Sequence, residues 1–437
     1  MRILAPYAYF APEQAASSYI WQNLHERFAD EGICCDVFTP LPCRGIPDEV
    51  REEYTEKKQE SLYDGKLNIY RFRLWREPQG TLGRFVRYIA QCIWQYFHLA
   101  FGNKGRWDAV FCASTPPIMG ATCVLLKKKL HIPFVYNLQD IFPDSLFNNG
   151  LAKKDGLLWK IGRKLEDFTY RNADRIIVIS EDFKKNIMAK GVPEEKIVVV
   201  YNWVDQNAVV NVPREENKLF DKYGLDRSKF YVTYCGNIGL SQNMEMLLCV
   251  AEELQKGSRV SEVQGDSKDY SDIQFVLVGN GAYLDEVKRM VAERHLENVH
   301  LLPFQPYEDI SHVFSLGDVS LVISKPGTGA ASVPSKTWSI MSASKPVLAN
   351  FDENELKTIL EGSSSLSGSS SSRPCGIFTK AGDKVAFTDA ILRLYKHPEL
   401  CKEYGQNGRQ FVMENLTKEV GTQKYVDVIK SVVRDHK

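Results

Sequence analysis

The sequence lacks the features of several large protein classes. No apolar run is long enough for a transmembrane helix, and Met1-Arg-Ile-Leu begins a strand directly, so we expect neither a membrane span nor a signal peptide. The ten cysteines include no CxxC pair and no zinc spacing, which favours reduced, cytosolic thiols over disulfides or metal ligands. Lys+Arg and Asp+Glu both number 55, so the net charge indicates no nucleic-acid partner.

A further absence concerns the start of the chain. Arg2–Ala5 and Cys34–Thr39 are predicted strands joined by a helix over Ala15–Asp30, and no GxGxxG follows the first strand. The alternation predicts an α/β fold with parallel sheets. The missing glycines argue against a dinucleotide, and we expect no cofactor.

The α/β pattern runs twice along the chain, and its 437 residues are enough for two domains. We place the first domain at residues 1–206, a polar linker at 207–217, the second domain at 218–415 and a last helical segment at 416–437. Residues 42–66 are charged and contain Pro and Gly, so they are predicted to form a long surface loop.

The stretch Asp318–Phe351 is predicted to form a strand, a glycine loop, a helix and a strand. The loop contains Gly327 and Gly329, and a proline suits the first turn of the helix. Such a loop presents backbone N–H groups and a helix dipole to an anion. Lys325 and Lys336 bracket it, which favours a phosphate or diphosphate ligand; an ordinary crossover with two surface lysines is the alternative.

The predicted helix Thr81–Phe101 combines a narrow polar stripe with a broad aromatic and aliphatic face. The stripe recurs every three or four residues and consists of Arg84, Arg87, Gln91, Gln95 and His98. Such a helix is typical of a membrane surface, and burial against a sheet is the alternative. Residues 66–129 carry eleven Lys/Arg against two acids, Glu77 and Asp108, which favours an anionic partner surface over a merely solvated basic face.

Several segments occur in an order that resembles a known family. Val333–Phe351 (VPSKTWSIMSASKPVLANF) resembles the nucleotide-sugar loop of the retaining family 4 glycosyltransferases, in the bacterial branch for O-antigen, capsule and exopolysaccharide that includes fucosamine-transferase-like enzymes. Further segments match in the family's order: Tyr9–Glu13, Asn137–Asp144, Asn172–Ser180, Tyr201–Asp205, Tyr234–Leu240 and Phe275–Gly281. The likeness spans nearly the whole chain.

The resemblance is incomplete at the binding residues. The family places two glutamates, eight positions apart, around the loop, and this chain has Ala331 and Ser339 there. The Arg and Lys usual after the second-domain glycine are Asn237 and Gln242. The His that often precedes the first-domain aspartate is Gln139.

The resemblance implies a GT-B type fold, with two Rossmann-like domains facing a cleft and a last helix that crosses back to the first domain. It implies transfer of a hexosyl or N-acetylhexosaminyl unit, with retention, from a UDP-linked nucleotide sugar to a polyprenyl-diphosphate-linked or glycan acceptor. No two aspartates lie two residues apart, so the DxD metal site is missing and we expect metal-independent transfer. Such an enzyme is expected in the cytoplasm, peripherally bound to the anionic inner face of the cell membrane.

The resemblance also suggests the site residues. Donor-binding candidates in the second domain are Asn237, Gly239, Gly279, Lys325, Gly327, Ser335, Lys336, Thr337 and Ser339. In the first domain Gln139, Asp140 and Asp144 follow a strand, where such sheets place functional groups. Asp140 is expected to orient the sugar or the acceptor hydroxyl, with a turn or helix cap as the alternative. Glu13 is expected either to face the cleft or to cap a helix.

Two other functions fit the same architecture. A nucleotide-sugar 2-epimerase would need no acceptor, which leaves the basic aromatic helix unexplained. A non-catalytic nucleotide-sugar-binding partner of polysaccharide assembly would account for the missing glutamates.

Overall fold

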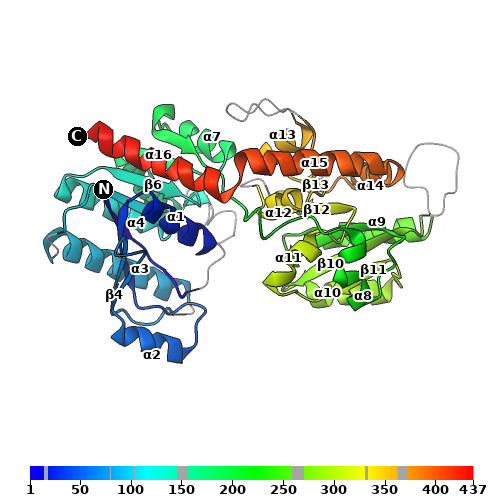
Figure 1. Cartoon of the computed structure of the whole chain (residues 1–437), viewed down its shortest axis with the longest axis horizontal. Coiled ribbons are helices and arrows are strands. Elements are labelled where there is room, and N and C mark those ends of the chain that lie inside the picture. The colour runs from blue at the N-terminus through cyan, green and yellow to red at the C-terminus, as the bar shows by residue number, and fades with distance from the viewer. Residues whose placement is uncertain are drawn as a thin grey trace. The chain divides into compact units, whose positions relative to one another are not determined.

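A computed structural model describes residues 1–13, 18–78, 80–102, 105–144, 156–257, 270–329, 333–362 and 373–436 (Figure 1). The chain divides into two compact units, the first from Met1–Asn202 with Gly421–Lys437 and the second from Trp203–Val420. Each is an α/β unit built on its own sheet, which confirms the predicted fold class. The predicted linker, residues 207–217, belongs to the second unit, and residues from Gly421 onward belong to the first.

The first unit contains an eight-stranded sheet in the order β3-β4-β2-β1-β5-β6-β7-β8. Only β3 runs antiparallel to its neighbour. The strands are β1 (Arg2–Pro6), β2 (Cys34–Pro40), β3 (Gln59–Leu62), β4 (Leu67–Phe72), β5 (Ala109–Ala113), β6 (Phe134–Leu138), β7 (Arg175–Val178) and β8 (Ile197–Val199). The helices are α1 (Ser18–Asp30), α2 (Asp48–Glu56), α3 (Thr81–Phe97) with the π-helical turn η1 (His98–Gly102), α4 (Pro117–Leu130), α6 (Leu157–Asn172), α7 (Glu181–Ala189), η2 (Glu194–Lys196) and most of α16 (Lys418–His436).

The second unit contains a six-stranded parallel sheet in the order β11-β10-β9-β12-β13-β14. The strands are β9 (Phe230–Asn237), β10 (Ile273–Asn280), β11 (Val299–Leu302), β12 (Val319–Ile323), β13 (Val347–Phe351) and β14 (Gly376–Lys380). The helices are η3 (Arg214–Glu216), α8 (Lys218–Tyr223), α9 (Met244–Gln255), α10 (Leu284–Glu293), η4 (Tyr307–Asp309), α11 (Ile310–Phe314), α12 (Lys336–Ser342), α13 (Glu355–Glu361), α14 (Lys384–Lys396) and α15 (Pro398–Asn415).

Residues 42–66 do not form the predicted long loop, because they contain helix α2 and strand β3. β3 pairs antiparallel with β4 at the edge of the first sheet. The buried Arg71 forms an ion pair with Glu60 of β3, and Arg51 of α2 donates to the carbonyls of Pro42 and Leu74. Charged residues therefore hold this segment on the sheet edge, where composition alone suggested a solvated loop.

The middle of helix α3 buries polar side chains and exposes apolar ones, the reverse of an ordinary surface helix, whereas Arg84 and His98 at the two ends of the predicted stripe are exposed. Arg87, Gln91 and Gln95 of the predicted stripe are fully buried. Six large apolar side chains of α3 and η1 are at least half exposed: Leu82, Phe85, Val86, Ile93, Phe97 and Phe101. The expectation that Arg87 faces a partner surface is wrong, since its guanidinium donates to the Trp75 carbonyl at 3.1 Å.

The inward polar face follows from the strand ends beneath it. The amide of Gln95 donates to the carbonyls of Tyr7 at 3.2 Å and Phe38 at 2.8 Å, and Gln91 donates to Tyr7 at 3.0 Å. Tyr7 directly follows β1, and Phe38 lies two residues before the end of β2, where its carbonyl also accepts from the Tyr7 amide at 3.0 Å. Buried carbonyl oxygens such as these are normally paired with donors. No helix within the described ranges has the length and apolarity to cross a bilayer.

The last helix, α16, contributes to the core of the first unit (Figure 1). Tyr425 is fully buried, and its hydroxyl donates to Asn137 Oδ1 on β6 at 3.1 Å. Lys430 forms an ion pair with Glu31, which follows α1, at 2.7 Å. A segment from the far end of the sequence thus touches the carboxyl end of β6, next to the predicted Gln139 and Asp140.

Candidate functional site

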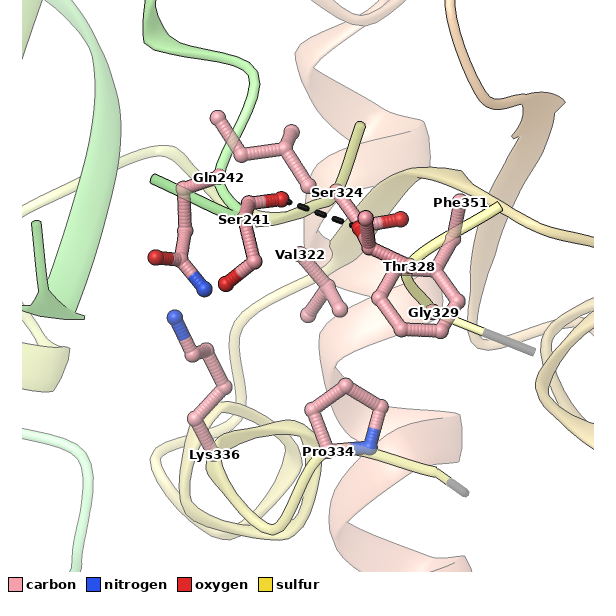
Figure 2. Close-up of a pocket in the computed structure, with 10 residues that line it drawn as sticks. Ser241, Gln242, Val322, Ser324, Thr328, Gly329, Pro334, Lys336 and Phe351 are labelled. Carbon is pink, nitrogen blue, oxygen red and sulfur yellow. Dashed lines mark hydrogen bonds between the residues drawn. The ribbon is translucent and has the colours of Figure 1, made fainter. Parts of the chain in front are cut away.

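A pocket of about 200 Å³ lies at the carboxyl ends of β9, β12 and β13 in the second unit (Figure 2). Open parallel sheets bind ligands at this edge, because the connecting loops and helix starts converge there. Its lining residues are Ser241, Gln242, Val322, Ile323, Ser324, Thr328, Gly329, Pro334, Lys336 and Phe351. The Asp318–Phe351 stretch therefore forms much of the wall.

Lys336 provides the positive charge of the pocket. Its Nζ lies 3.9 Å from the centre of the Tyr234 ring, and Figure 2 shows it pointing toward Ser241 and Gln242. No hydrogen bond or ion pair joins this ammonium to any other residue that the structure describes. Burial lowers the pKa of Lys336 to about 8. A desolvated cation without an acidic partner is a physical signature of an anion site.

Lys325, the second predicted cation, already has a partner. Its Nζ lies 3.1 Å from Glu245 Oε1, and the Tyr283 hydroxyl donates to the same oxygen at 2.5 Å. The ammonium also lies 5.3 Å from the centre of the Tyr283 ring. Because Glu245 neutralises this charge locally, Lys325 contributes less to an anion site than Lys336.

The glycine loop differs in an informative way from its prediction. The N–H groups of Gly327 and Gly329 donate to Asp352 Oδ1 at 2.9 Å and Oδ2 at 2.8 Å. Gly327 has a φ of +81°, which glycine adopts readily. The loop does bind an anion through its amides, but that anion is a carboxylate of the same unit.

Three more predicted residues lie at the ends of β9 and β10. The Gly239 amide donates to Gln242 Oε1 at 3.0 Å, and the exposed Asn237 accepts from the Tyr234 hydroxyl through its carbonyl at 2.6 Å. A Cβ on Gly279 would lie 1.9 Å from the carbonyl oxygen of Gly236, so only glycine fits there.

The predicted polar residues around α12 have three different environments. Ser335 is exposed at the N-cap and its side chain caps no amide. Thr337 is fully buried, and its Oγ1 has no hydrogen-bond partner among the described residues. Ser339 is half-buried. Ala331, the other position of a missing glutamate, lies outside the described residues.

The first-domain candidate Gln139 belongs to a hydrogen-bond network. Its Nε2 donates to Asn137 Oδ1 at 3.0 Å, and its Oε1 accepts from Asn202 Nδ2 at 2.9 Å. The Tyr425 hydroxyl lies 3.4 Å from the same Nε2. Residues from β6, α16 and the segment after β8 thereby fix the Gln139 side chain.

Asp140, Asp144 and Glu13 lie in three different environments. Asp140 is exposed after β6, and its amide donates to Ser114 Oγ at 3.1 Å. Asp144 forms an ion pair with Lys190 at 2.8 Å. Glu13 is buried and accepts from the amides of Phe10 and of residues 43 and 44 at 2.8–3.1 Å. Burial raises the pKa of Glu13 against the effect of these hydrogen bonds, which favour a structural role.

The sequence analysis missed Asp352, Ser241 and Tyr234 at the pocket. Asp352 directly follows β13, and Ser241 follows β9 by four residues. Their place after parallel strands was the available signal. Among the described residues, no group of three or more His, Cys, Asp or Glu side chains is arranged to hold a metal ion.

Two family profiles together match most of the chain. The profile described as Glycosyltransferase Family 4 matches residues 18–208, and that described as Glycosyl transferases group 1 matches residues 215–411. The probable glycosyltransferase WbjE of Pseudomonas aeruginosa is 26% identical over 82% of this chain and 83% of its own. The putative colanic acid biosynthesis glycosyl transferase WcaI of Escherichia coli K12 is 24% identical over 78% and 81%.

Solved structures share the fold at low sequence identity. HepE of Anabaena in complex with UDP has a TM-score of 0.68 at 14% identity, covering 99% of this chain and 100% of that one. Sucrose-phosphate synthase of Thermosynechococcus elongatus has a TM-score of 0.68 at 15% identity, covering 99% of both chains. The fold is thus the GT-B fold of glycosyltransferases, and with both profiles matched in order the chain belongs to the family 4 glycosyltransferases.

Proposed function

We propose that this protein transfers a sugar from a UDP-linked nucleotide sugar to a lipid-linked or glycan acceptor in bacterial cell-surface polysaccharide synthesis. The observation that carries the proposal is the desolvated ammonium of Lys336, which has no hydrogen-bond or ion-pair partner among the described residues and lies in a pocket at the carboxyl end of the second sheet. Two relatives support it, one named as a probable glycosyltransferase and the other as a putative colanic acid biosynthesis glycosyl transferase. They favour neither a 2-epimerase nor a non-catalytic binding partner.

In this proposal Lys336 holds the diphosphate and stabilises the negative charge that grows on it as the sugar departs. Gln242 and Ser241 point into the same space and provide neutral hydrogen-bonding groups (Figure 2). They take the place of further cations, since Lys325 is paired with Glu245. Ser335, Thr337 and Ser339 remain candidates for contacts to the nucleotide sugar.

Retention follows from attack on the face of the sugar that the diphosphate leaves. The bond from the anomeric carbon to the diphosphate oxygen breaks as the bond to the acceptor oxygen forms, and the acceptor proton passes to the departing phosphate. No enzyme nucleophile is needed in this scheme. Asp140, exposed after β6 and held through its amide by Ser114, is proposed to orient the sugar or the acceptor hydroxyl. Gln139 is its neighbouring candidate.

Calorimetry with UDP tests the donor site. Lys336→Ala should weaken UDP binding by about 1–3 kcal/mol, because a charged hydrogen bond is lost. The matched control is Lys357→Ala, which removes a half-buried lysine of α13 that pairs with Glu353. Wild-type protein that binds no nucleoside diphosphate would contradict the proposal, as would equal affinities for the two variants.

We also propose that transfer needs no divalent metal ion, because the sequence has no DxD pair. Turnover measured in excess chelator should match turnover in untreated buffer. Complete loss of turnover that returns on adding Mg²⁺ or Mn²⁺ would contradict this.

We propose further that the protein attaches reversibly to the anionic inner face of the cell membrane through its first unit. The exposed apolar side chains of α3 supply the buried area that interfacial binding requires. α4 packs against both α3 and α6, and α6 adds the exposed Leu157 and Ile161.

Cations accompany these apolar residues. Lys128 and Lys129 of α4 and Lys160 and Lys164 of α6 are exposed, and none of the four forms an ion pair within the described part of the chain. Lys127 is unsuited to this role because it pairs with Asp174 at 2.7 Å. Each lysine near an anionic bilayer contributes about 1 kcal/mol.

Vesicle sedimentation tests the attachment. Binding should require anionic lipid, weaken with salt, and fall for Phe97→Ser and for Lys128→Gln with Lys129→Gln. Val385→Ser is the matched control, since it removes a half-exposed apolar side chain from α14 of the other unit. Protein that stays in the supernatant at low salt would favour a soluble acceptor instead.

A further inference from the structure

The glycine loop before α12 already binds an anionic side chain, that of Asp352 after β13. The amides of Gly327 and Gly329 both point at the Asp352 carboxylate, each within hydrogen-bond distance of a different oxygen. Two backbone donors on one carboxylate form charge-assisted hydrogen bonds, which are stronger than neutral ones. These two amides are therefore already engaged, and a ligand phosphate would have to displace Asp352 to use them.

The same loop forms one wall of the pocket. The Thr328 hydroxyl lies 2.7 Å from the Lys325 carbonyl and 3.2 Å from the Ser241 carbonyl, the contact drawn as a dashed line in Figure 2. A Cβ on Gly329 would lie 2.6 Å from both the Phe351 ring and Ser324 Oγ. Asp352 fixes the residues on either side of Thr328, so it sets where Thr328 and Gly329 stand in the wall.

We propose that Asp352 is a positioning residue for the nucleotide. Its carboxylate fills the amide cradle that the loop would otherwise offer to phosphate, and thereby holds the wall in the shape that admits the diphosphate beside Lys336. Asp352 itself does not touch the nucleotide. This inference rests on the proposed donor site and adds to it the reason that the loop carries glycines at 327 and 329.

UDP calorimetry on Asp352→Ala tests the inference. Affinity should fall by about tenfold, as expected from the loss of two charged hydrogen bonds that order the wall. Acetate or formate, small enough to refill the vacated cradle, should restore most of the affinity, whereas chloride at equal ionic strength should not. Glu353→Ala is the matched control, because it removes a neighbouring surface carboxylate that pairs only with Lys357 among the described residues. Its affinity and that of wild type should not respond to acetate.

Asp352→Asn provides a second test if the alanine variant folds poorly. It keeps the size and one acceptor oxygen but places an N–H₂ group against an amide, so its affinity should lie between wild type and Asp352→Ala, without acetate rescue. An Asp352→Ala protein that binds UDP as well as wild type, or more tightly, would overturn the inference alone. A wild-type protein that binds no UDP would overturn the proposed function and this inference together.

Discussion

The carboxyl ends of the two sheets use their polar groups in different ways. In the first unit Asn137, Gln139, Asn202 and Tyr425 are linked to one another by hydrogen bonds. In the second, Lys336 is desolvated and its ammonium has no hydrogen-bond or ion-pair partner among the described residues. The hydrogen bonds among the four first-unit residues stabilise the fold, although Asn137 Nδ2 and Asn202 Oδ1 have no partner among the described residues. A desolvated charge lowers stability and favours a ligand of opposite sign. The difference predicts that mutations in the hydrogen-bond network of the first unit change the free energy of unfolding. Mutations at the Lys336 pocket of the second unit should change the affinity for UDP.

The largest expected difference between the two units is in the loss of stability at low pH. His25 is fully buried among Tyr7, Phe10 and Phe28, and burial lowers its pKa to about 4 from an ordinary 6.5. The neutral imidazole is favoured on folding, so its contribution is fully present above about pH 6.5 and is lost as the pH falls toward 4. That loss amounts to roughly 3 kcal/mol. Urea unfolding at pH 7 and pH 4.5 should show it in the first unit.

The control is His25→Phe, which keeps an aromatic ring without the titration. Its unfolding should depend less on pH over the same range. An equal pH dependence in the two proteins would assign the acid sensitivity to other groups.

Exchanging a polar for an apolar residue on one face of α3, and an apolar for a polar residue on the other, tests which face is buried. The effects on stability should be the opposite of those on an ordinary surface helix. Gln95→Leu leaves the carbonyls of Tyr7 and Phe38 with one donor fewer and should lower the free energy of unfolding by about 1–3 kcal/mol. Phe97→Ser, on the exposed face, should change it by about 0.5 kcal/mol or less. Chemical denaturation of both variants decides the point; a stabilised Gln95→Leu protein would mean that the inward polar face is wrong.

The affinity for UDP should depend on pH through Lys336. Its pKa of about 8 in the free pocket means that the ammonium form dominates below that pH. Binding of the anion raises the pKa, so affinity should be constant below pH 8 and fall about tenfold for each pH unit above it. Calorimetry across pH 7–10 in buffers of matched ionic strength would measure this. Lys336→Arg, which stays charged, should flatten the profile.

A modest effect on stability is expected in the first-unit network. Tyr425→Phe removes the hydroxyl that donates to Asn137 and should lower stability by about 1 kcal/mol while leaving the affinity for UDP unchanged. A changed UDP affinity with unchanged stability would reverse the assignment of roles to the two sheet edges.

Local patterns in the sequence determined most of the fold. The alternating strands and helices, the glycines at turns and the order of the segments predict two α/β units, since these features depend on neighbouring residues. The strand–loop–helix character of Asp318–Phe351 and the place of Lys336 at the start of α12 were also predictable. Residues 42–66 were mispredicted because α2 and β3 depend on the buried Arg71 and on an edge pairing distant in sequence.

Only the tertiary structure decided which polar groups have partners. Periodicity shows that α3 has two faces but not which one is buried, and the carbonyls of Tyr7 and Phe38 decide that. Lys325 and Lys336 are equivalent by sequence, but Glu245 of α9 neutralises one and none of the described carboxylates pairs with the other. Asp352 lies 23 residues from Gly329 and accepts a hydrogen bond from the loop amide that the sequence predicts for a ligand. The physical reason is common to all three cases, since the energy of a polar group depends on partners that only folding brings within hydrogen-bond distance.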